Sequence, residues 1–436
     1  MTINGPGGNG ADREPPEIDT SVAHVARVYD WLLGGTANDV PDTGTRLEIN
    51  DWSSYGCENA PMTDLLPDEP LHRLRARRST KWRAHGPEVL PLSIAEMDFA
   101  LPDGVREALA DAVERSDTGY AMPADGLGEA LAGFAERRWG WRIDPAAATA
   151  ATDVSAGVVE MLRLFTNPGD RVVINPPVYS PFFDWLHEAR TELQAVPLGD
   201  GRLDLPALDR AFATKPAAYV LCNPHNPVGR VHTYEELATV AELATRHGVP
   251  VISDEIHAPL TLPSATYTPF LTVPGAGHIG VSVVSPSKAF NLAGLKCATV
   301  VTASSRMRDV AAKLPRDLRW RSGHFGVIAS IAAYNEGDEW LDRLLATLDD
   351  RRTLLTELIR DRLPSVSWRP PQATYLAWLD CHSLGSGTEP SDRFLAAGVA
   401  LEDGVRFGEP SGYVRLNFGT STEVLKLAVG RMASAL

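Results

Sequence analysis

The chain has 436 residues, which is more than one compact domain usually contains, and 44% of them are hydrophobic. Its net charge of −15 argues against a nucleic-acid partner, because proteins that bind the phosphate backbone present a basic surface. No apolar run reaches the ~18 residues that span a bilayer, and the first twenty residues lack the basic and apolar regions of a secretory signal. We therefore expect a cytoplasmic protein of more than one domain, with neither membrane nor nucleic-acid partners.

The cysteines point to the same compartment. All four are scattered along the chain, and no two of them have the CxxC spacing of a metal or redox site: Cys57, Cys222, Cys297 and Cys381. We interpret them as small buried apolar residues, so we predict neither a disulfide framework nor a bound metal.

The first fifty residues are predicted to be an N-terminal extension. Residues 1–20 are rich in glycine, proline and charge, which is typical of disorder. Residues 21–34 have apolar positions at helical spacing, and Gly34 and Gly35 should end that helix. With the following GTANDV, this segment resembles the start of a family of S-adenosylmethionine-dependent methyltransferase-like proteins. No glycine-rich cofactor loop follows, so we interpret it as a fused fragment or a packing appendage.

From about residue 88 the chain alternates short apolar strands with amphipathic helices, which indicates an α/β fold. The strands are almost continuously apolar, as in a parallel sheet covered on both faces. The helix at 233–248 should begin with a Thr233–Glu236 capping box and end at Gly248. Beyond about residue 325 we expect helices and then a small mixed unit with strands at 374–379 and 412–419. The predicted strands of the main sheet are 171–175, 217–222, 250–254, 281–285 and 297–302.

Lys288 is the residue most suggestive of chemistry. It is one of only six lysines, and it follows an apolar strand among small and hydroxyl side chains in SVVSPSKAFNLAGLK. A lysine that forms a Schiff base needs such a strand end, where it can lose its charge and reach an aldehyde. A solvated surface charge is the ordinary alternative for an isolated lysine, so the interpretation depends on what surrounds it.

Three further residues supply that context. Asp254 ends a buried apolar strand, where a carboxylate is costly unless it meets a cation such as a protonated ring nitrogen. Asn226, in the turn NPHNPVG, could donate a hydrogen bond to a ring oxygen. Arg415 lies between apolar strand residues and suits a carboxylate ligand, although a buried ion pair would also explain it.

A phosphate site is predicted at the start of the helix in DVSAGVVEML (153–162). Small residues there would expose backbone N–H groups, which bind phosphate at helix N-termini. Ser285, three residues before Lys288, and Lys296, eight residues after it, could add a hydroxyl and a cation.

Taken together, these segments resemble the pyridoxal-phosphate (PLP) enzymes of fold type I, in the aminotransferase class I/II superfamily. The resemblance covers roughly residues 65–436 and is most similar to the MalY/PatB-type group of cystathionine or cysteine-S-conjugate β-lyases. It implies a large domain with a mostly parallel sheet covered by helices, and a smaller α+β domain. The segments that carry it are STKW (79–82), LPLSIAEMDF (90–99), PPVYSPFF (176–183), NPHNPVG (223–229), SDEIH (253–257), SPSKAFNLAGLK (285–296) and GYVRLNFG (412–419).

The resemblance also implies domain limits and roles. Residues 51–99 would begin the small domain, 100–325 would form the large PLP-binding domain, and 326–436 would complete the small domain. Every implied role belongs to one of three sets. The cofactor would be held by Lys288 as its Schiff base, Asp254, Asn226, His257, Tyr179 (stacked on the ring), Ala156, Gly157, Val158, Ser285 and Lys296, with Tyr120 reaching the neighbouring subunit's phosphate in a homodimer. The substrate would be held by Arg415, Asn226 and the backbone around Ala95. Catalysis would fall to Lys288, Asp254, Tyr179 and Arg415.

The implied reaction is α,β-elimination from cystathionine or another L-cysteine S-conjugate, giving a thiol, pyruvate and ammonia. Ser180 stands where many relatives have a second tyrosine, and Pro259 where many have an acidic residue, so the substrate side chain stays open. The same residues would serve an aminotransferase on an L-amino acid, or a C–S lyase recruited to specialised metabolism. A regulatory role through protein contact is a further alternative, whereas residues 1–50 are too short and too acidic for a DNA-binding module.

Overall fold

The computed structural model describes residues 65–122, 126–385 and 387–436, and these described residues belong to one compact unit. The predicted helix at 21–34, the methyltransferase-like segment and Cys57 lie outside the described residues. Among the described helices, none is long and apolar enough to cross a membrane. The helices are α2 (Leu71–Leu74), α3 (Thr80–Arg83), α4 (Asp103–Glu114), α5 (Leu127–Trp139), α6 (Val154–Phe165), α7 (Pro181–Glu188), α8 (Leu205–Ala213), α9 (Tyr234–His247), α10 (Ala276–Ile279), α11 (Ser305–Ala311), α12 (Arg316–Trp320), α13 (His324–Glu336), α14 (Asp338–Arg362), α15 (Pro390–Ala396) and α16 (Thr422–Ser434).

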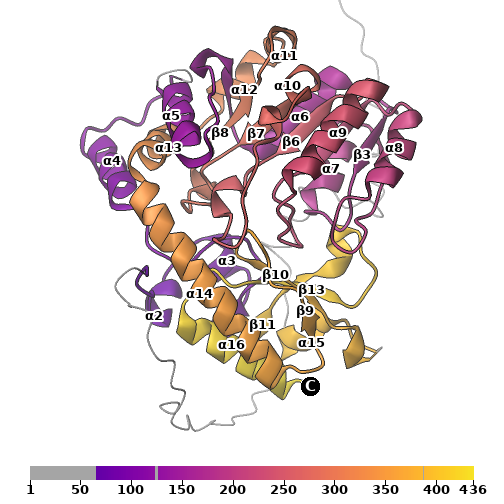
Figure 1. Cartoon of the computed structure of the whole chain (residues 1–436). Helices are drawn as coiled ribbons and strands as arrows, with labels where there is room; N and C mark the ends of the chain where they lie inside the picture. The colour runs from indigo at the N-terminus through magenta and orange to yellow at the C-terminus, as the bar shows by residue number, and fades with distance from the viewer. Residues whose placement is uncertain (1–64, 123–125, 386) are drawn as a thin grey trace, which may run out of the picture. The chain divides into compact units, whose positions relative to one another are not determined.

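The larger sheet has seven strands in the order β2-β8-β7-β6-β5-β3-β4, and Figure 1 labels β3, β6, β7 and β8 among them. All five predicted main-sheet strands are present, and the sequence missed the edge strands β2 and β4. The sheet is mostly parallel, as expected, and β8 alone runs antiparallel to its neighbours β7 and β2. Apolar residues along a strand indicate that both of its faces are covered, but they do not indicate the direction in which the strand runs. The strands are β2 (Ala148–Ala151), β3 (Arg171–Ile174), β4 (Glu192–Ala195), β5 (Ala218–Cys222), β6 (Val251–Asp254), β7 (Gly280–Val284) and β8 (Ala298–Val301).

Helices cover both faces of this sheet, and successive strand residues pack into two different apolar clusters. Val172 and Ile174 pack with residues of α6 and α7, whereas Val173, between them, packs with residues of α8 and α9. This alternation follows from the two-residue period of a strand. Helix α9 is capped as predicted, because Thr233 and Glu236 exchange side chain to backbone hydrogen bonds and Gly248 adopts a φ of 74°.

A smaller unit contains a four-stranded sheet in the order β12-β13-β10-β9 and a two-stranded parallel pair, β1 with β11. The pair joins Leu90 to Val399, so the segment before residue 99 is built into the C-terminal part of the chain. The predicted domain limits at residues 51, 100 and 326 remain predictions. The strands are β1 (Leu90–Pro91), β9 (Ser367–Trp368), β10 (Leu376–Asp380), β11 (Val399–Ala400), β12 (Glu402–Asp403) and β13 (Tyr413–Asn417).

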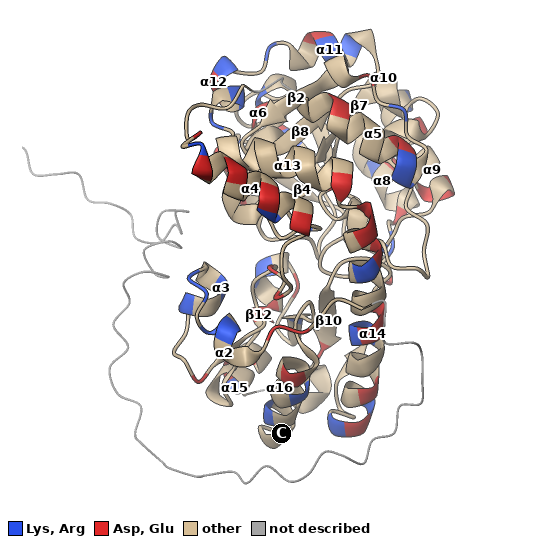
Figure 2. Cartoon of the chain, turned by 90° about the vertical axis from the view of Figure 1, so that its left-hand side faces the viewer, with Lys and Arg blue, Asp and Glu red and all other residues tan. Residues whose placement is uncertain are grey.

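Helix α14 packs against α16 and carries both acidic and basic residues along its length (Figure 2). Leu341, Leu348 and Leu355 are fully buried and recur at a spacing of seven residues, which places them on one face of the helix. Leu344, Thr347, Arg351 and Ile359 are buried as well, whereas every other charged residue of the helix is at least partly exposed.

Candidate active site

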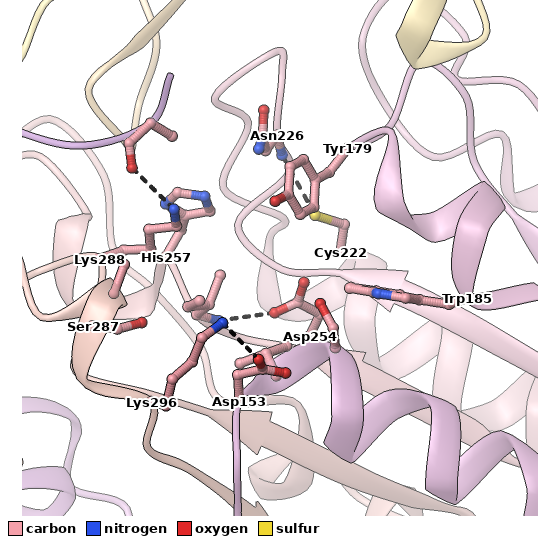
Figure 3. A pocket seen from close by; sticks show the side chains of 15 residues that line it. Asp153, Tyr179, Trp185, Cys222, Asn226, Asp254, His257, Ser287, Lys288 and Lys296 are labelled. Carbon is pink, nitrogen blue, oxygen red and sulfur yellow. Dashed lines mark hydrogen bonds and ion pairs between the residues drawn. The ribbon is translucent and has the colours of Figure 1, made fainter. Parts of the chain in front are cut away.

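A pocket lies where β5 and β6 end, and Lys288 follows the adjacent strand β7 (Figure 3). β5, β6 and β7 are parallel neighbours, so the turns after them meet at one edge of the sheet, where ligands of open α/β sheets bind. The pocket is lined by Ala95, Asp153, Val154, Ser155, Tyr179, Trp185, Cys222, Asn226, Asp254, Ile256, His257, Ser287, Lys288, Ala293 and Lys296.

Lys288 projects into this pocket, and its amino group donates a hydrogen bond to the carbonyl oxygen of Ala95 at 2.9 Å. Burial, followed by the positive charge of Arg415, lowers the pKa of Lys288 to about 8. About a tenth of the amine is therefore neutral at pH 7, a far larger share than for an ordinary lysine, and the neutral form is the one that attacks an aldehyde or accepts a proton.

Asp254 occupies the last position of β6 and is 3% exposed. Its carboxylate accepts a hydrogen bond from the backbone N–H of Ile256 at 3.1 Å. Burial raises the pKa of Asp254 to about 7, so its charge is costly without a cationic partner. The pocket thus holds a buried carboxylate suited to a protonated nitrogen.

Arg415 comes from β13, in the smaller sheet, and is 3% exposed. Its guanidinium donates to Asn226 Oδ1 at 3.2 Å and to the Ser93 carbonyl at 2.8 Å, and it lies 4.9 Å from the ring centroid of Phe407. Its Nε is buried and has no hydrogen-bond partner in the described part of the chain. Arg415 is therefore fixed on two sides, and an anion would complete its hydrogen bonds.

Tyr179 and His257 are further members of the pocket lining, and both are neutral near pH 7. Burial raises the pKa of the Tyr179 hydroxyl to about 12. Burial, followed by the charges of Lys288 and Arg415, lowers the pKa of His257 to about 3. The Tyr179 backbone N–H donates to the Asn226 carbonyl at 3.0 Å, which ties the two loops together.

The start of α6 borders the pocket, as the sequence indicated for DVSAGVVEML (153–162). Val154 and Ser155 line it, whereas Ala156, Gly157 and Val158 do not appear in its lining. The Ala156 and Gly157 N–H groups are bound by Asp153, and Val158 is fully buried in the apolar core. The helix begins where the sequence indicated, with Asp153 as its N-cap and Val154 as its first residue, and the phosphate role of Ala156, Gly157 and Val158 stays a prediction.

Three other predicted residues are placed as follows. Lys296 lines the pocket and forms an ion pair with Asp153 at 3.0 Å. The Ser285 hydroxyl donates to the Cys297 carbonyl at 2.7 Å and is absent from the lining, where Ser287 appears instead. Tyr120 is 89% exposed and does not line this pocket, so its role across a subunit interface stays a prediction.

Several residues in and beside the pocket were not singled out from the sequence, among them Cys222, Trp185 and Tyr375. Cys222 lines the pocket just before NPHNPVG, although the sequence indicated only a buried apolar residue, and Trp185 reaches it from α7. Tyr375 donates a hydrogen bond to the Ala95 carbonyl at 2.8 Å, on the same oxygen that Lys288 uses. Position next to a motif could have indicated Cys222, but no local pattern marks the other two.

The family model for aminotransferase class I and II matches residues 87–432. The chain belongs to this family. A Mycobacterium tuberculosis protein provisionally named a cystathionine beta-lyase is 45% identical over 401 residues, covering 85% of this chain and 98% of that protein. The Bacillus subtilis cystathionine beta-lyase PatB is 34% identical over 374 residues, covering 82% of this chain and 97% of PatB.

Solved structures of the family show the same fold. A Corynebacterium diphtheriae protein, provisionally named a PLP-dependent beta-cystathionase, has a TM-score of 0.81 and 35% identity, over 85% of this chain and 98% of that one. Cystalysin from Treponema denticola, whose structure contains pyridoxal 5′-phosphate, has a TM-score of 0.78 and 25% identity, over 85% of this chain and 98% of that one.

Proposed function

We propose that this chain is a PLP-dependent carbon–sulfur β-lyase that cleaves cystathionine or another L-cysteine S-conjugate to a thiol, pyruvate and ammonia. The observation that carries the proposal is the position of Lys288, in a pocket that also holds the buried carboxylate of Asp254 and lies beside the buried Arg415. The family and the relatives named as cystathionine beta-lyases support the same activity.

The residues present fit pyridoxal 5′-phosphate. Lys288 would bind it covalently, Asp254 would pair with its ring nitrogen, and Asn226, whose Oδ1 already accepts from Arg415, would donate its amide N–H to the ring oxygen. Tyr179 and His257 would contact the ring. Its phosphate would meet the N-terminus of α6, with Lys296 and the Ser285–Ser287 turn nearby.

The chain's own groups can then perform the elimination. Arg415 would bind the substrate α-carboxylate, which orients the Cα–H bond toward Lys288. The Lys288 amine would remove the Cα proton, and Asp254 would keep the ring nitrogen protonated. The bound cofactor supplies an electron sink for the electron pair left at Cα. A sulfur substituent on Cβ would depart as a thiolate.

Purified holoenzyme with L-cystathionine and with S-methyl-L-cysteine tests the proposal. We expect pyruvate, ammonia and thiol to form in equal amounts from at least one conjugate. Transfer of the amino group to a keto acid, without release of thiol from either conjugate, would establish an aminotransferase instead. A wider series of conjugates would reveal recruitment to specialised metabolism, through fast turnover of one large conjugate alone.

We also propose a cytoplasmic homodimer that shares its active sites. Ten large hydrophobic residues of the described chain are exposed, and among them Tyr120 at 89%, Met122 at 64% and Trp320 at 47% are of the types that are enriched at protein interfaces. The three described cysteines are buried free thiols, consistent with a reducing compartment. Sedimentation at micromolar concentration should give the mass of two chains, and a single-chain mass would remove Tyr120 from the site.

A further inference from the structure

Residues 93–98, with the sequence SIAEMD, form a segment that we name the active-site strap. It has no helix or strand of its own, yet its carbonyl oxygens hold both cations of the proposed mechanism. The Ser93 carbonyl accepts from Arg415 at 2.8 Å, and the Ala95 carbonyl accepts from Lys288 at 2.9 Å. The orientations of the carboxylate-binding group and of the base therefore depend on the path of one irregular stretch of backbone.

The strap is in turn held by side chains from other elements. Asn417, two residues beyond Arg415 on β13, donates from its amide nitrogen to the Ile94 and Glu96 carbonyls, both at 2.7 Å. Asn291, three residues after Lys288, donates to the Met97 carbonyl at 2.9 Å. Each cation is thus accompanied by a nearby asparagine that fixes the strap at a second point.

The far end of the strap is held by a buried ion pair. Lys81 of α3 and Asp98 lie 2.8 Å apart, and each side chain is 1% exposed. Lys81 also donates to the Glu96 carbonyl at 2.9 Å, and the Trp82 indole N–H donates to Asp98 at 2.9 Å. Burial lowers the pKa of Lys81, against the favourable effect of Asp98, so the pair is kept at a cost in desolvation. A buried pair of this kind contributes little to stability, and its retention suggests a gain in specificity of conformation.

We propose that Lys81 and Asp98 are positioning residues, a clamp that fixes the strap so that the Ser93 and Ala95 carbonyls orient Arg415 and Lys288. The inference rests on the proposed function, in which Arg415 binds the α-carboxylate and Lys288 is the base. It gives a role to two segments, STKW and IAEMDF, that mark the resemblance to the lyases but contain no residue directed at substrate except Ala95.

The geometry sets the expected consequence of loosening the clamp. A buried guanidinium that loses the Ser93 carbonyl can rotate away from the carboxylate direction, and a displacement of about 1 Å in a positioned group costs on the order of a hundredfold in rate. The amine of Lys288 would lose its acceptor at the same time. Recognition of the carboxylate should therefore suffer selectively, whereas an amine without a carboxylate should bind almost as before.

The test compares two ligands that differ only in the carboxylate, L-alanine and ethylamine, each titrated into holoenzyme while the absorbance of the bound cofactor is followed. Neither ligand has a sulfur leaving group, so the result does not depend on lyase activity and fails separately from the proposed function. We expect Lys81→Met to raise the dissociation constant of L-alanine at least tenfold and that of ethylamine less than twofold. Lys81→Arg, which keeps the charge and can reach Asp98, should restore most of the difference.

The double variant Lys81→Met with Asp98→Leu separates positioning from stability, because it removes both charges of the pair together, whereas Lys81→Met alone leaves Asp98 with only the Trp82 indole N–H and the partly exposed Arg77 as side-chain partners. We expect the double variant to have a higher melting temperature than Lys81→Met, while its dissociation constant for L-alanine stays at least fivefold above that of the wild type. The matched control is Arg137→Met, which breaks the Arg137–Asp338 ion pair between α5 and α14 and should leave both ligands unchanged. Equal weakening of both ligands in Lys81→Met, or wild-type binding of L-alanine in a folded double variant, would overturn the proposal.

Discussion

The two sides of the pocket are built in different ways. On the sheet side, Asn226, Asp254 and Lys288 each follow or end a strand of the parallel sheet, and their side chains enter the pocket directly. On the opposite side, the active-site strap offers main-chain carbonyls that hold Arg415 and Lys288. Chemistry on the first side depends on residue identity, whereas on the second it depends on the path of the backbone. The sheet side should therefore respond to single substitutions at the pocket, and the strap side to substitutions behind it.

The largest effect should come from the sheet side. Lys288→Ala removes both the covalent attachment and the proposed base, so we expect turnover of an S-conjugate to fall at least ~10⁴-fold. Absorbance of the purified protein should also lose the band of the covalently bound cofactor. Lys296→Ala is the control, because that lysine lines the same pocket and should retain the band. A variant at Lys288 that keeps turnover within tenfold would refute the assignment.

Asp254→Asn, also on the sheet side, should increase the stability of the cofactor-free protein while it decreases turnover. The folded pKa of about 7 lies above the ordinary carboxyl value of 3.8, so ionisation of Asp254 destabilises the cofactor-free protein as pH rises from about 4 through 7. At pH 8 the substitution should stabilise that protein by up to about 4 kcal/mol, since each pKa unit corresponds to about 1.4 kcal/mol.

Urea unfolding of both cofactor-free proteins at pH 5 and pH 8 measures this gain. The difference between them should be clearly smaller at pH 5, and the variant should lose most of its turnover because the ring nitrogen has no anionic partner. A gain that is independent of pH would show that Asp254 is not ionising in the folded chain.

Arg415→Gln tests the strap side through its cation. Truncating one partner of a buried, hydrogen-bonded charge pair costs about 2–5 kcal/mol, so we expect kcat/KM for an S-conjugate to fall about a hundredfold, mainly through KM. Steady-state kinetics checks the split between KM and kcat. A change confined to kcat would mean that Arg415 acts on the chemical step and not on binding of the carboxylate.

The smallest expected effect is a shift in the pKa of Lys288, on the sheet side, when Arg415, on the strap side, is replaced. With a pKa of about 8, Lys288 is mostly protonated at pH 6, so the rate of cofactor uptake by the cofactor-free enzyme should rise about tenfold per pH unit and level off above pH 8. Because Arg415 lowers this pKa, Arg415→Gln should move the midpoint upward. Stopped-flow absorbance between pH 6 and pH 9.5 measures both midpoints, and an unchanged midpoint in the variant would separate the two cations electrostatically.

The contrast also explains what could be predicted from the sequence. Strand ends can be predicted from the sequence, because an apolar run followed by a polar residue indicates both the strand and the residue at which it ends, as at Asp254. The five main-sheet strands and the capped helix α9 were predicted for that reason. The antiparallel direction of β8 was not, since coverage of both faces leaves no trace of direction in the apolar pattern.

The strap side was largely hidden from the sequence. Every residue has the same backbone carbonyl, so a sequence does not show which carbonyl binds a side chain. Only the resemblance suggested the region of Ala95, and nothing suggested that Ser93 binds Arg415. Tyr375 and Trp185 were missed because their contacts depend on how distant segments pack. The start of α6 was predicted within DVSAGVVEML, but small residues alone do not reveal that Asp153 caps the helix through the Ala156 N–H.

The hydrogen bond from Arg415 to Ser93 joins residues 322 positions apart, and this separation has a consequence for biosynthesis. A ribosome that adds about 5–20 residues per second makes Arg415 on the order of 20–60 s after Ser93. During that interval the strap lacks its contact with Arg415, whereas the strand that ends at Asp254 and the strand that precedes Lys288 have already been synthesised and can pair. Competence to bind an amino acid is thus among the last properties the nascent chain acquires.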